Sequence, residues 1–389
     1  MPELYLLDPS PAPVWAPFQF SRPVAECRAG AWLIRERWEA IADASATAVF
    51  AAPHLHAFVE DGAPPVRAQE PVHGPALIGR SDFAPAGVPP DLPAGPARLV
   101  NEDETVGWWV PTGSVWTGAT AEGEPVELEG VRLHGAFDLV TALEHLLVGD
   151  VADFLREGGD PIPEGSIVLG EPHEVVLLGA AVEPGVVFDT RQGAIVLEQH
   201  SYVCSGSRLQ GPLYVGPGTE ILGGSVGGSA LGARCKVRGE LTASVFFGYG
   251  NKAHEGFVGH SIIGRWANLG AGTTTSNLKN TYGAVRLDVA GTRIETGRQF
   301  LGTLVGDHAK TAIGTLFPTG AVVGMGANVF GAANAPKDIP PFAWGDSGNR
   351  VSLDGFLTTA RRVMPRRAVE VTEAVAAALT AAHRFGTEA

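Results

Sequence analysis

The sequence predicts an α/β domain, followed by a parallel β-helix and a C-terminal helical segment. Three observations carry this prediction: an apolar run followed by a helical pattern near the start, a six-residue aliphatic repeat through the middle, and a helical pattern at the end. The chain has 389 residues, of which 51 are Gly and 29 are Pro. This excess of turn-forming residues argues against a helical bundle.

Residues 1–160 have the pattern of a small α/β domain. Residues 4–7 form a short apolar run that ends at Asp8-Pro9, as a buried strand does. Apolar residues recur at helical spacing over 31–41 and again over 138–157, where Gly158 and Gly159 end the pattern. Prolines crowd the segment between these helices, so we expect much of it to be loop.

Residues 161–345 carry a repeat of about six residues, in which small residues and Gly separate aliphatic ones. A hexapeptide β-helix has this pattern, because one apolar side chain per six points inward and three hexapeptides close one triangular coil. Residues 275–300 do not keep the repeat, and we expect them to form a loop that leaves the solenoid at one corner. The predicted inward residues are Val215, Ile221, Leu231, Val237, Phe257, Ile263, Leu269, Val305, Thr311, Phe317, Val323 and Val329.

Residues 346–389 form the third segment. It contains an arginine run over 361–367 and then Val371, Val375 and Leu379, which are four residues apart. This spacing predicts a helix that caps the solenoid or reaches a neighbouring subunit.

Charge and composition limit the partners. The formal net charge is -14, which opposes binding to nucleic acid. Three scattered cysteines do not form a disulfide framework, and no apolar stretch is long enough to span a bilayer. The opening residues lack the basic start and apolar run of a signal peptide. We therefore expect a cytoplasmic protein that binds neither nucleic acid nor membrane.

Three motifs over residues 250–280 resemble a known family. They are Asn-Lys-Ala-His at 251–254, Asn-Leu-Gly-Ala-Gly at 268–272 and Ser-Asn-Leu-Lys-Asn at 276–280. They resemble hexapeptide-repeat sugar acyltransferases, above all the bifunctional glucosamine-1-phosphate N-acetyltransferase and N-acetylglucosamine-1-phosphate uridylyltransferase family. The sequence looks like the alternate bacterial branch of that family, a group of sugar nucleotidyltransferase-like proteins. Further pieces that fit this branch are Arg22-Pro23, Arg28-Ala29-Gly30, Gly306-Asp307-His308 and Phe342-Ala343-Trp344-Gly345.

This resemblance implies a left-handed β-helix that forms a homotrimer, with active sites at the subunit boundaries and acetyl-coenzyme A as the acyl donor. It implies that His254 is the general base on the sugar amine and that Asn268 and Asn277 contact the substrate. The chemistry is reasonable, because an attacking amine must lose a proton and His titrates near neutrality. An Asn amide can stabilise the developing oxyanion, and Lys252 or Lys279 can hold a phosphate.

Three residues are candidates for the coenzyme site. We place Ala271, within the Asn-Leu-Gly-Ala-Gly motif, at this site. Arg366 and Arg367 can meet the phosphates of coenzyme A, although the same arginines are equally consistent with a solvated face.

The sequence also departs from the family. Phe257 stands where a Tyr is common, which removes one hydroxyl from the sugar-phosphate site. No Gly-rich phosphate loop follows residues 4–7, and the prolines there remove N–H donors. Arg22 and Arg28 remain as candidate nucleotide contacts, and Asn101-Glu102-Asp103 is a candidate acidic cluster. Mg²⁺ is expected only if residues 1–160 still transfer nucleotides.

Three alternatives to acetyl transfer stay open. The first is a UTP-dependent sugar-1-phosphate nucleotidyltransferase acting through residues 1–160. The second is a non-catalytic trimeric β-helix scaffold. The third is a hydratase with zinc held between subunits. His254 and His260 are one hexapeptide apart and therefore lie on successive faces, which argues against a shared metal within one chain, and we predict no metal site.

Overall fold

The protein is described from a computed structural model covering residues 2–156 and 158–388. The chain forms two compact units. Unit 1 comprises Met1–Cys27, Trp32–Ala136 and Val371–Ala389, and unit 2 comprises Arg28–Ala31 and Phe137–Glu370.

These units divide the chain differently from the ranges 1–160, 161–345 and 346–389. Helix α2 (Asp138–Phe154) belongs to unit 2, where Phe154 packs on Tyr214 with ring centroids 5.9 Å apart. Glu157, the predicted last residue of this helix, lies outside the described residues. The third predicted range is split, since helix α3 (Leu353–Val363) belongs to unit 2 and α4 (Glu373–Glu388) belongs to unit 1.

Unit 1 is built on a mixed sheet of seven strands in the order β12-β9-β10-β7-β1-β4-β5. Strand β1 (Glu3–Leu7) lies between β4 (Ala46–Phe50) and β7 (Ala76–Arg80) and is parallel to both. The predicted α/β class is therefore confirmed. The other elements of the sheet are β5 (Val66–Arg67), β9 (Ala97–Asn101), β10 (Glu104–Val110) and β12 (Glu124–Glu127), and the remaining helix and strands of the unit are α1 (Ile34–Ala42), β3 (Trp32–Leu33), β6 (Val72–His73), β8 (Phe83–Pro85), β11 (Val115–Trp116) and β13 (Gly130–Arg132).

The core of unit 1 is aromatic on one side of this sheet. Tyr5 stacks on Phe50 at 5.4 Å, and Phe50 stacks on Trp116 at 6.4 Å. Helix α4 adds Phe385, whose ring lies 3.6 Å from the ring of His54. The predicted C-terminal helix is thus confirmed, although it begins at Glu373 and leaves Val371 outside, and it packs within unit 1.

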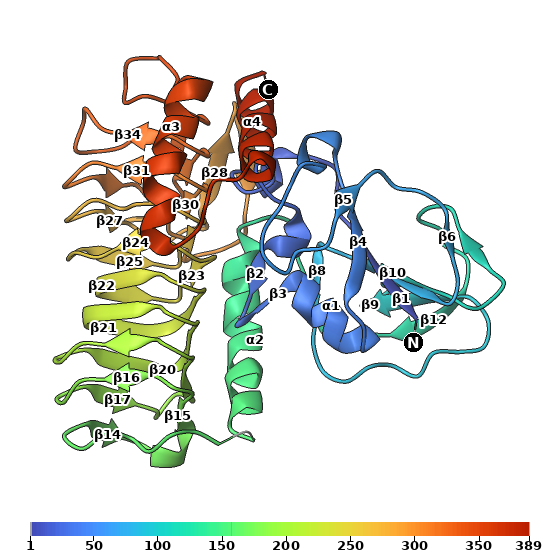
Figure 1. Cartoon of the computed structure of the whole chain (residues 1–389), viewed down its shortest axis with the longest axis horizontal. Coiled ribbons are helices and arrows are strands. Elements are labelled where there is room, and N and C mark those ends of the chain that lie inside the picture. The colour runs from blue at the N-terminus through green and yellow to red at the C-terminus, as the bar shows by residue number, and fades with distance from the viewer. Residues whose placement is uncertain (1, 157, 389) are drawn as a thin grey trace. The chain divides into compact units, whose positions relative to one another are not determined.

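Unit 2 is a parallel β-helix, as predicted (Figure 1). Its strands stack in register from coil to coil, and three columns of inward side chains fill the prism. Column one is Ile221, Val237, Lys252, Leu269, Thr311 and Val329; column two is Val226, Leu241, Val258, Thr275, Phe317 and Ala335; column three is Leu231, Phe246, Ile263, Val305, Val323 and Ile339.

The solenoid strands of unit 2 have two or three residues each, except β20, β21 and β22, which have 8, 12 and 7 residues. Strand β2 (Arg28–Ala29) comes from the early part of the chain. The solenoid strands are β14 (Ile167–Leu169), β15 (Val175–Leu177), β16 (Ala181–Val182), β17 (Val187–Asp189), β18 (Ile195–Leu197), β19 (Tyr202–Val203), β20 (Arg208–Val215), β21 (Glu220–Leu231), β22 (Lys236–Thr242), β23 (Val245–Phe246), β24 (Asn251–Lys252), β25 (Phe257–Gly259), β26 (Ile262–Ile263), β27 (Thr274–Thr275), β30 (Leu304–Val305), β31 (Lys310–Thr311), β32 (Leu316–Phe317), β33 (Val322–Val323), β34 (Asn328–Val329) and β35 (Asp338–Ile339).

The prism has three faces, one behind each column of inward side chains. Face one carries β24, β31 and β34, face two carries β25, β27 and β32, and face three carries β26, β30 and β33. The His254 corner lies between faces one and two, and the His260 corner lies between faces two and three.

One predicted inward residue is wrong. Val258 is fully buried in column two, and Phe257 is only partly buried on the outer side. The physical reason is a shorter step of five residues from Val258 to Ile263, which passes through His260 at a φ of 48°. A strict six-residue repeat overlooks this tight corner.

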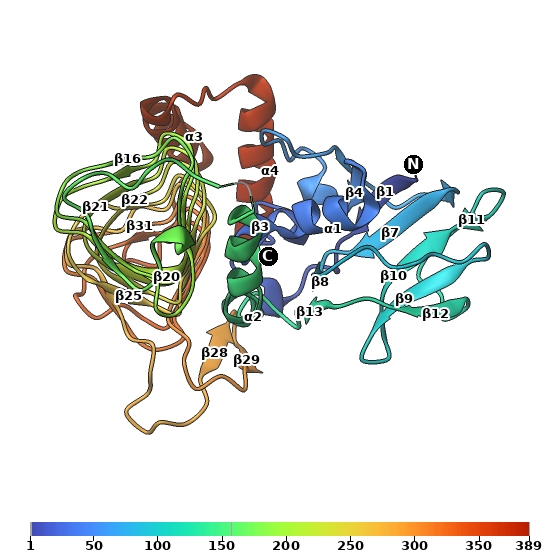
Figure 2. The same cartoon turned by 90° about the horizontal axis from the view of Figure 1, so that it is seen from below.

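The excursion predicted over residues 275–300 begins after Thr275, which lies in β27 and points into the prism, and it is more ordered than a plain loop. It contains an antiparallel hairpin of β28 (Arg286–Val289) and β29 (Thr292–Glu295), which Figure 2 shows outside the stacked coils. Leu287, Val289 and Ile294 are buried, and the Ala290 N–H donates to Asp338 Oδ2 at 2.9 Å. The hairpin therefore folds back onto a later coil.

Among the helices of residues 2–156 and 158–388, none is long and apolar enough to cross a membrane.

Candidate functional site

The His254 corner holds two predicted site residues on neighbouring coils. Asn251 bridges to Asn268 and Asn268 bridges to Lys310, so the residues three positions further on, His254, Ala271 and Ile313, are equivalent. His254 is exposed, Ala271 is half-buried, and Ile313 is 83% exposed. The structure therefore brings His254 and Ala271 together, and it adds an exposed apolar side chain that the sequence did not single out.

Lys252 has a position that differs from the expected one. It lies in column one with its side chain inside the prism, 1% exposed, among residues that are otherwise apolar or Thr. Its Nζ donates to the Arg238 carbonyl oxygen at 3.2 Å and to the His254 carbonyl oxygen. Burial lowers the pKa of this ammonium to about 8. The ammonium group of Lys252 is therefore not on the outer surface of the corner. The role of Lys252 in substrate binding stays a prediction.

Asn268 lies on face one, within a network of side chains. Asn251 Nδ2 donates to Asn268 Oδ1 at 2.6 Å, and Arg367 Nη2 donates to Asn251 Oδ1 at 3.4 Å. Arg234 Nη1 in turn donates to the Arg367 carbonyl oxygen at 2.8 Å. Two predicted residues, Asn268 and Arg367, are therefore connected through Asn251, whereas Arg366 is exposed.

The segment that carries Arg367 follows helix α3, which lies along the solenoid (Figure 1). Phe356 of this helix is buried against His308 at 5.4 Å and against Phe342 at 5.1 Å. Ser352 caps the helix by accepting a hydrogen bond from the Gly355 N–H. Together with the Arg367–Asn251 bond, this packing holds Arg367 close to face one.

Lys310 is a cation of face one that the sequence reasoning missed. It follows Asn268 in the ladder of that face, and its Nζ donates to the His308 carbonyl oxygen at 2.8 Å. Burial lowers the pKa of Lys310 to about 8. Asn251 was missed too. The signal that finds both is the coil register, because each aligns with Asn268 along face one.

Asn277 lies at the His260 corner. Its Nδ2 is 2.9 Å from His260 Nδ1, and the Phe300 ring stacks on His260 at 5.1 Å. Because the amide nitrogen is a donor, Nδ1 accepts and the neutral ring carries its proton on Nε2. Burial lowers the pKa of His260, which favours this neutral form.

Lys279 lines a hollow at the base of the excursion, with a volume of about 410 Å³. Its Nζ donates to the Ala284 carbonyl oxygen at 3.0 Å. Arg286 and Lys337 line the same hollow and form ion pairs with Glu295 at 2.7 Å and with Asp288 at 3.1 Å. The hollow therefore combines three cations with the hydroxyls of Ser276, Thr281 and Thr319, a lining that suits an anion.

Apart from Arg28, the inward Lys252 and the exposed Arg366, the predicted site residues of unit 2 thus fall into three places on one chain. His254 and Ala271 share one corner, Asn268 and Arg367 lie on face one, and Asn277 and Lys279 lie at or beyond the His260 corner. Face two separates the two corners. His254 and His260 are six residues apart, and an extended strand advances by about 3.3 Å per residue. One chain therefore does not bring His254 and Asn277 into direct contact.

The two candidate nucleotide contacts have structural partners. Arg22 is 2% exposed and donates to both carboxylate oxygens of Glu60, at 2.9 and 3.2 Å. Arg28 is buried in unit 2, donates to the Ala31 carbonyl oxygen and lies 5.5 Å from the Tyr214 ring centroid. The two arginines therefore belong to different units.

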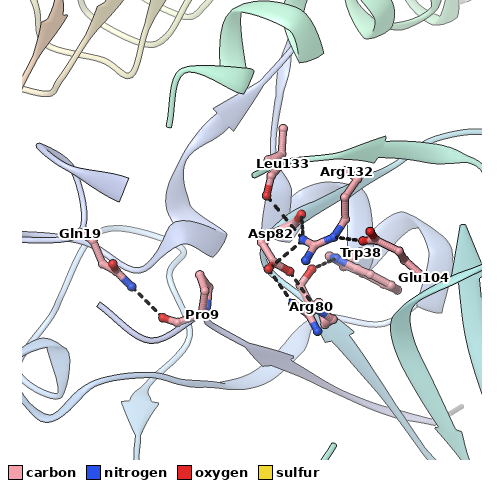
Figure 3. Close-up of polar contacts among 8 residues, drawn as sticks. All are labelled: Pro9, Gln19, Trp38, Arg80, Asp82, Glu104, Arg132 and Leu133. Carbon is pink, nitrogen blue, oxygen red and sulfur yellow. Dashed lines mark hydrogen bonds and ion pairs between the residues drawn. The ribbon is translucent and has the colours of Figure 1, made fainter. Parts of the chain in front are cut away.

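The carboxyl ends of β1 and β7 in unit 1 hold two carboxylates in contrasting surroundings. Asp8 follows β1 and accepts hydrogen bonds from the N–H groups of Val24 at 2.7 Å and Ala25 at 3.2 Å. Burial raises the pKa of Asp8 to about 7. Burial also opposes ionisation of Asp82, yet hydrogen bonds and charges from Arg80 and Arg132 lower its pKa. Figure 3 shows both arginines on Asp82, with Arg132 also reaching Glu104.

The candidate acidic cluster Asn101-Glu102-Asp103 is a hairpin tip. Glu102 and Asp103 have φ angles of 48° and 67° and connect β9 to β10. This geometry suits Asp103, because Asp tolerates left-handed backbone angles in tight turns. In the part of the chain that the structure describes, no group of three or more His, Cys, Asp or Glu side chains is placed to hold a metal ion.

Comparisons with known proteins agree with the resemblance found in the sequence. Residues 6–78 match the family model described as sugar nucleotidyl transferase. The chain is similar to a bifunctional sugar-1-phosphate nucleotidylyltransferase/acetyltransferase of Sulfurisphaera tokodaii, with 33% identity over 100 residues, which are 26% of this chain and 25% of that protein. It is also similar to the bifunctional protein GlmU of Methanococcus vannielii, with 31% identity over 130 residues, which are 33% of this chain and 29% of that protein.

A third relative is the bifunctional protein GlmU of Prochlorococcus marinus, with 26% identity over 166 residues, which are 42% of this chain and 32% of that protein. The matches therefore span about a quarter to a third of the length of these relatives. The predicted resemblance is confirmed at modest identity, and the relative from Sulfurisphaera tokodaii is named as a nucleotidylyltransferase/acetyltransferase.

Proposed function

We propose that the protein is an acetyl-coenzyme A-dependent N-acetyltransferase that acts on an amino-sugar phosphate resembling glucosamine 1-phosphate, in the synthesis of UDP-N-acetylglucosamine. The observation that carries this proposal is the exposed His254 at a solenoid corner, with Ala271 on the next coil. The imidazole would accept the proton that the amine loses as it attacks the thioester. The small side chain of Ala271 leaves room beside it for the acyl group.

The proposed site is shared between subunits of a homotrimer. Ile313, two coils further along the His254 corner, is 83% exposed, and Leu316 on adjoining face two is 43% exposed. Apolar side chains exposed together beside a polar site are typical of a protein interface. A second copy of the chain docked here would cover them and could bring its own His260 corner towards His254.

The remaining residues have proposed roles in binding. Asn277 would contact the sugar, and Lys279, with Arg286 and Lys337, would hold the phosphate in the cationic hollow. Asn268 would contact the substrate or its acyl group. Arg367, held beside face one, would meet the phosphates of coenzyme A, and the exposed Arg366 could join it. We place the reaction in the cytoplasm, where acetyl-coenzyme A is available.

A second candidate function is sugar nucleotidyl transfer by unit 1, which the family match over residues 6–78 favours. Two contacts make it the weaker candidate. The N–H groups of Val24 and Ala25 already bond to Asp8, and Arg22 is already paired with Glu60. These donors are buried as well as paired, whereas Arg286 and Lys337 in the cationic hollow are paired but partly exposed. This reaction would require UTP and Mg²⁺, whereas acetyl transfer requires neither.

The test is release of free thiol from acetyl-coenzyme A in the presence of a panel of amino-sugar phosphates, with and without UTP and Mg²⁺. We expect thiol release with at least one acceptor and without nucleotide. His254→Ala should lower kcat by about a hundredfold or more, as expected for loss of a general base. His200→Asn is the matched control, because His200 is also an exposed corner histidine of the solenoid. A rate that no acceptor changes would contradict the proposal.

A further inference from the structure

Lys252 is a charged residue inside the solenoid, at a position where the neighbouring coils carry apolar side chains. It pairs with Val237 on the coil before, and the next members of column one are Leu269 and Thr311. Burying an ammonium among such residues is costly unless its protons are bonded. A lysine at this position therefore calls for a specific partner.

The partners of Lys252 are two backbone carbonyls of the His254 corner. Nζ donates to the Arg238 carbonyl oxygen at 3.2 Å, one coil earlier, and to the carbonyl oxygen of His254 itself. The side chain thus ties the backbone of His254 to the preceding coil from inside the prism. On the outside, Arg238 also pairs with Glu255 at 2.7 Å, but both side chains are exposed and this surface pair contributes little.

The coil length changes at Lys252. Val237 pairs with Lys252, fifteen residues later, whereas Asn251 bridges to Asn268, seventeen residues later. Where successive coils differ in length, their corner carbonyls do not stack in register as strand carbonyls do, and buried carbonyls still require donors. The Lys252 ammonium supplies donors at this transition.

We propose that Lys252 is a positioning residue, which fixes the backbone at His254 and so sets the direction from which the imidazole meets its substrate. This inference rests on the proposed role of His254 as general base. Lys252 itself touches no substrate in this account. Loss of its ammonium should leave the fold intact and should loosen the His254 corner.

Lys252→Met tests the proposal, because Met fills a similar volume and removes the donors. Leu269→Met is the matched control, since it changes the same column one coil later without removing a donor. In acetyl transfer we expect Lys252→Met to lower kcat by about ten- to a hundredfold, as misplacement of a reacting group does, with the KM for acetyl-coenzyme A unchanged. Leu269→Met should keep the kcat of the unaltered protein.

A second readout does not depend on activity. In protein with ¹⁵N-labelled histidine, the His254 ring signals should shift or broaden in Lys252→Met, while those of His200 stay unchanged. Unaltered His254 signals in a folded Lys252→Met protein would overturn the proposal, and so would an unaltered kcat. If the unaltered protein acetylates no acceptor, the proposed function fails, and the ring signals still decide whether Lys252 positions His254.

Discussion

The side chain of Asn277 bonds to the ring of His260, with Nδ2 and Nδ1 2.9 Å apart, and so connects two consecutive coils. Phe300, at the end of the excursion, covers the same ring. The pair therefore fixes the point at which the chain leaves and rejoins the solenoid.

Replacing the amide by a carboxylate should reverse the preference of His260 for the neutral form. In Asn277→Asp, the new charge should raise the pKa of His260, because the imidazolium gains an ionic partner. A proton NMR titration of the ring measures this pKa. Asn280→Asp, on an exposed part of the same excursion, is the control and should change it much less. An identical titration in both variants would contradict the described bond.

Burial of Lys310 should make the free energy of unfolding depend on pH in the alkaline range. The pKa of Lys310 is about 8 in the folded protein, against an ordinary value of 10.5, so between these values the unfolded chain binds more protons than the native state. The free energy of unfolding therefore rises with pH through this window, by up to about 1 kcal/mol per pH unit from this group. Denaturant unfolding at pH 8 and pH 10 measures the change. The difference between the unaltered protein and Lys310→Met isolates Lys310, and equal slopes would contradict its burial.

The chain rejoins the solenoid near Gly302, a position that has no room for a side chain. A Cβ atom there would lie 2.1 Å from the Gly259 carbonyl oxygen and 2.2 Å from Ser261 Oγ. Gly302→Ala should lower the free energy of unfolding by about 1–3 kcal/mol through overpacking. Gly149→Ala is the control, because the helical Gly149 has open space around it and Ala favours the helix. Thermal unfolding distinguishes them, and a stable Gly302→Ala would contradict the close approach.

Arg22 should act as a structural residue of unit 1. Arg22→Met removes one partner of a buried ion pair with Glu60 and should cost about 3–5 kcal/mol of stability. Arg293→Met removes an exposed pair with Asp288 and should change stability by about 0.5 kcal/mol or less. Chemical denaturation measures both. If Arg22→Met kept its stability and lost affinity for a nucleotide, Arg22 would be a phosphate contact instead.

The solenoid could be predicted because its inward positions, such as Val237, Ile263 and Val323, recur at nearly constant spacing and bury one side chain each. The exact register could not, because it depends on corner conformation. The left-handed turn at His260 shortens one step and places Val258 inside where Phe257 was expected. Once the register is known, it also shows that Asn251, Asn268 and Lys310 align along face one.

Other features of the site lie beyond sequence patterns. Lysine is rarely buried, so its appearance in the Asn-Lys-Ala-His motif indicates a surface role. Only the structure shows that Lys252 turns inward. Helix α2 is apolar at many positions, but a pattern does not say which unit it packs against. The exposure of Ile313 could not be predicted either, because an isoleucine before a glycine resembles the inward residues of the repeat.

We propose that His254 of one subunit acts with Asn277 and Lys279 of another. The most direct test combines two variants that we expect to be inactive, His254→Ala and Lys279→Ala. The two variants are refolded or co-expressed together, and thiol release from acetyl-coenzyme A is measured. If each site draws the two residues from different subunits of a trimer, random mixing restores about a quarter of the activity of the unaltered protein. Activity that stays as low in the mixed assembly as in each variant alone would contradict the shared site.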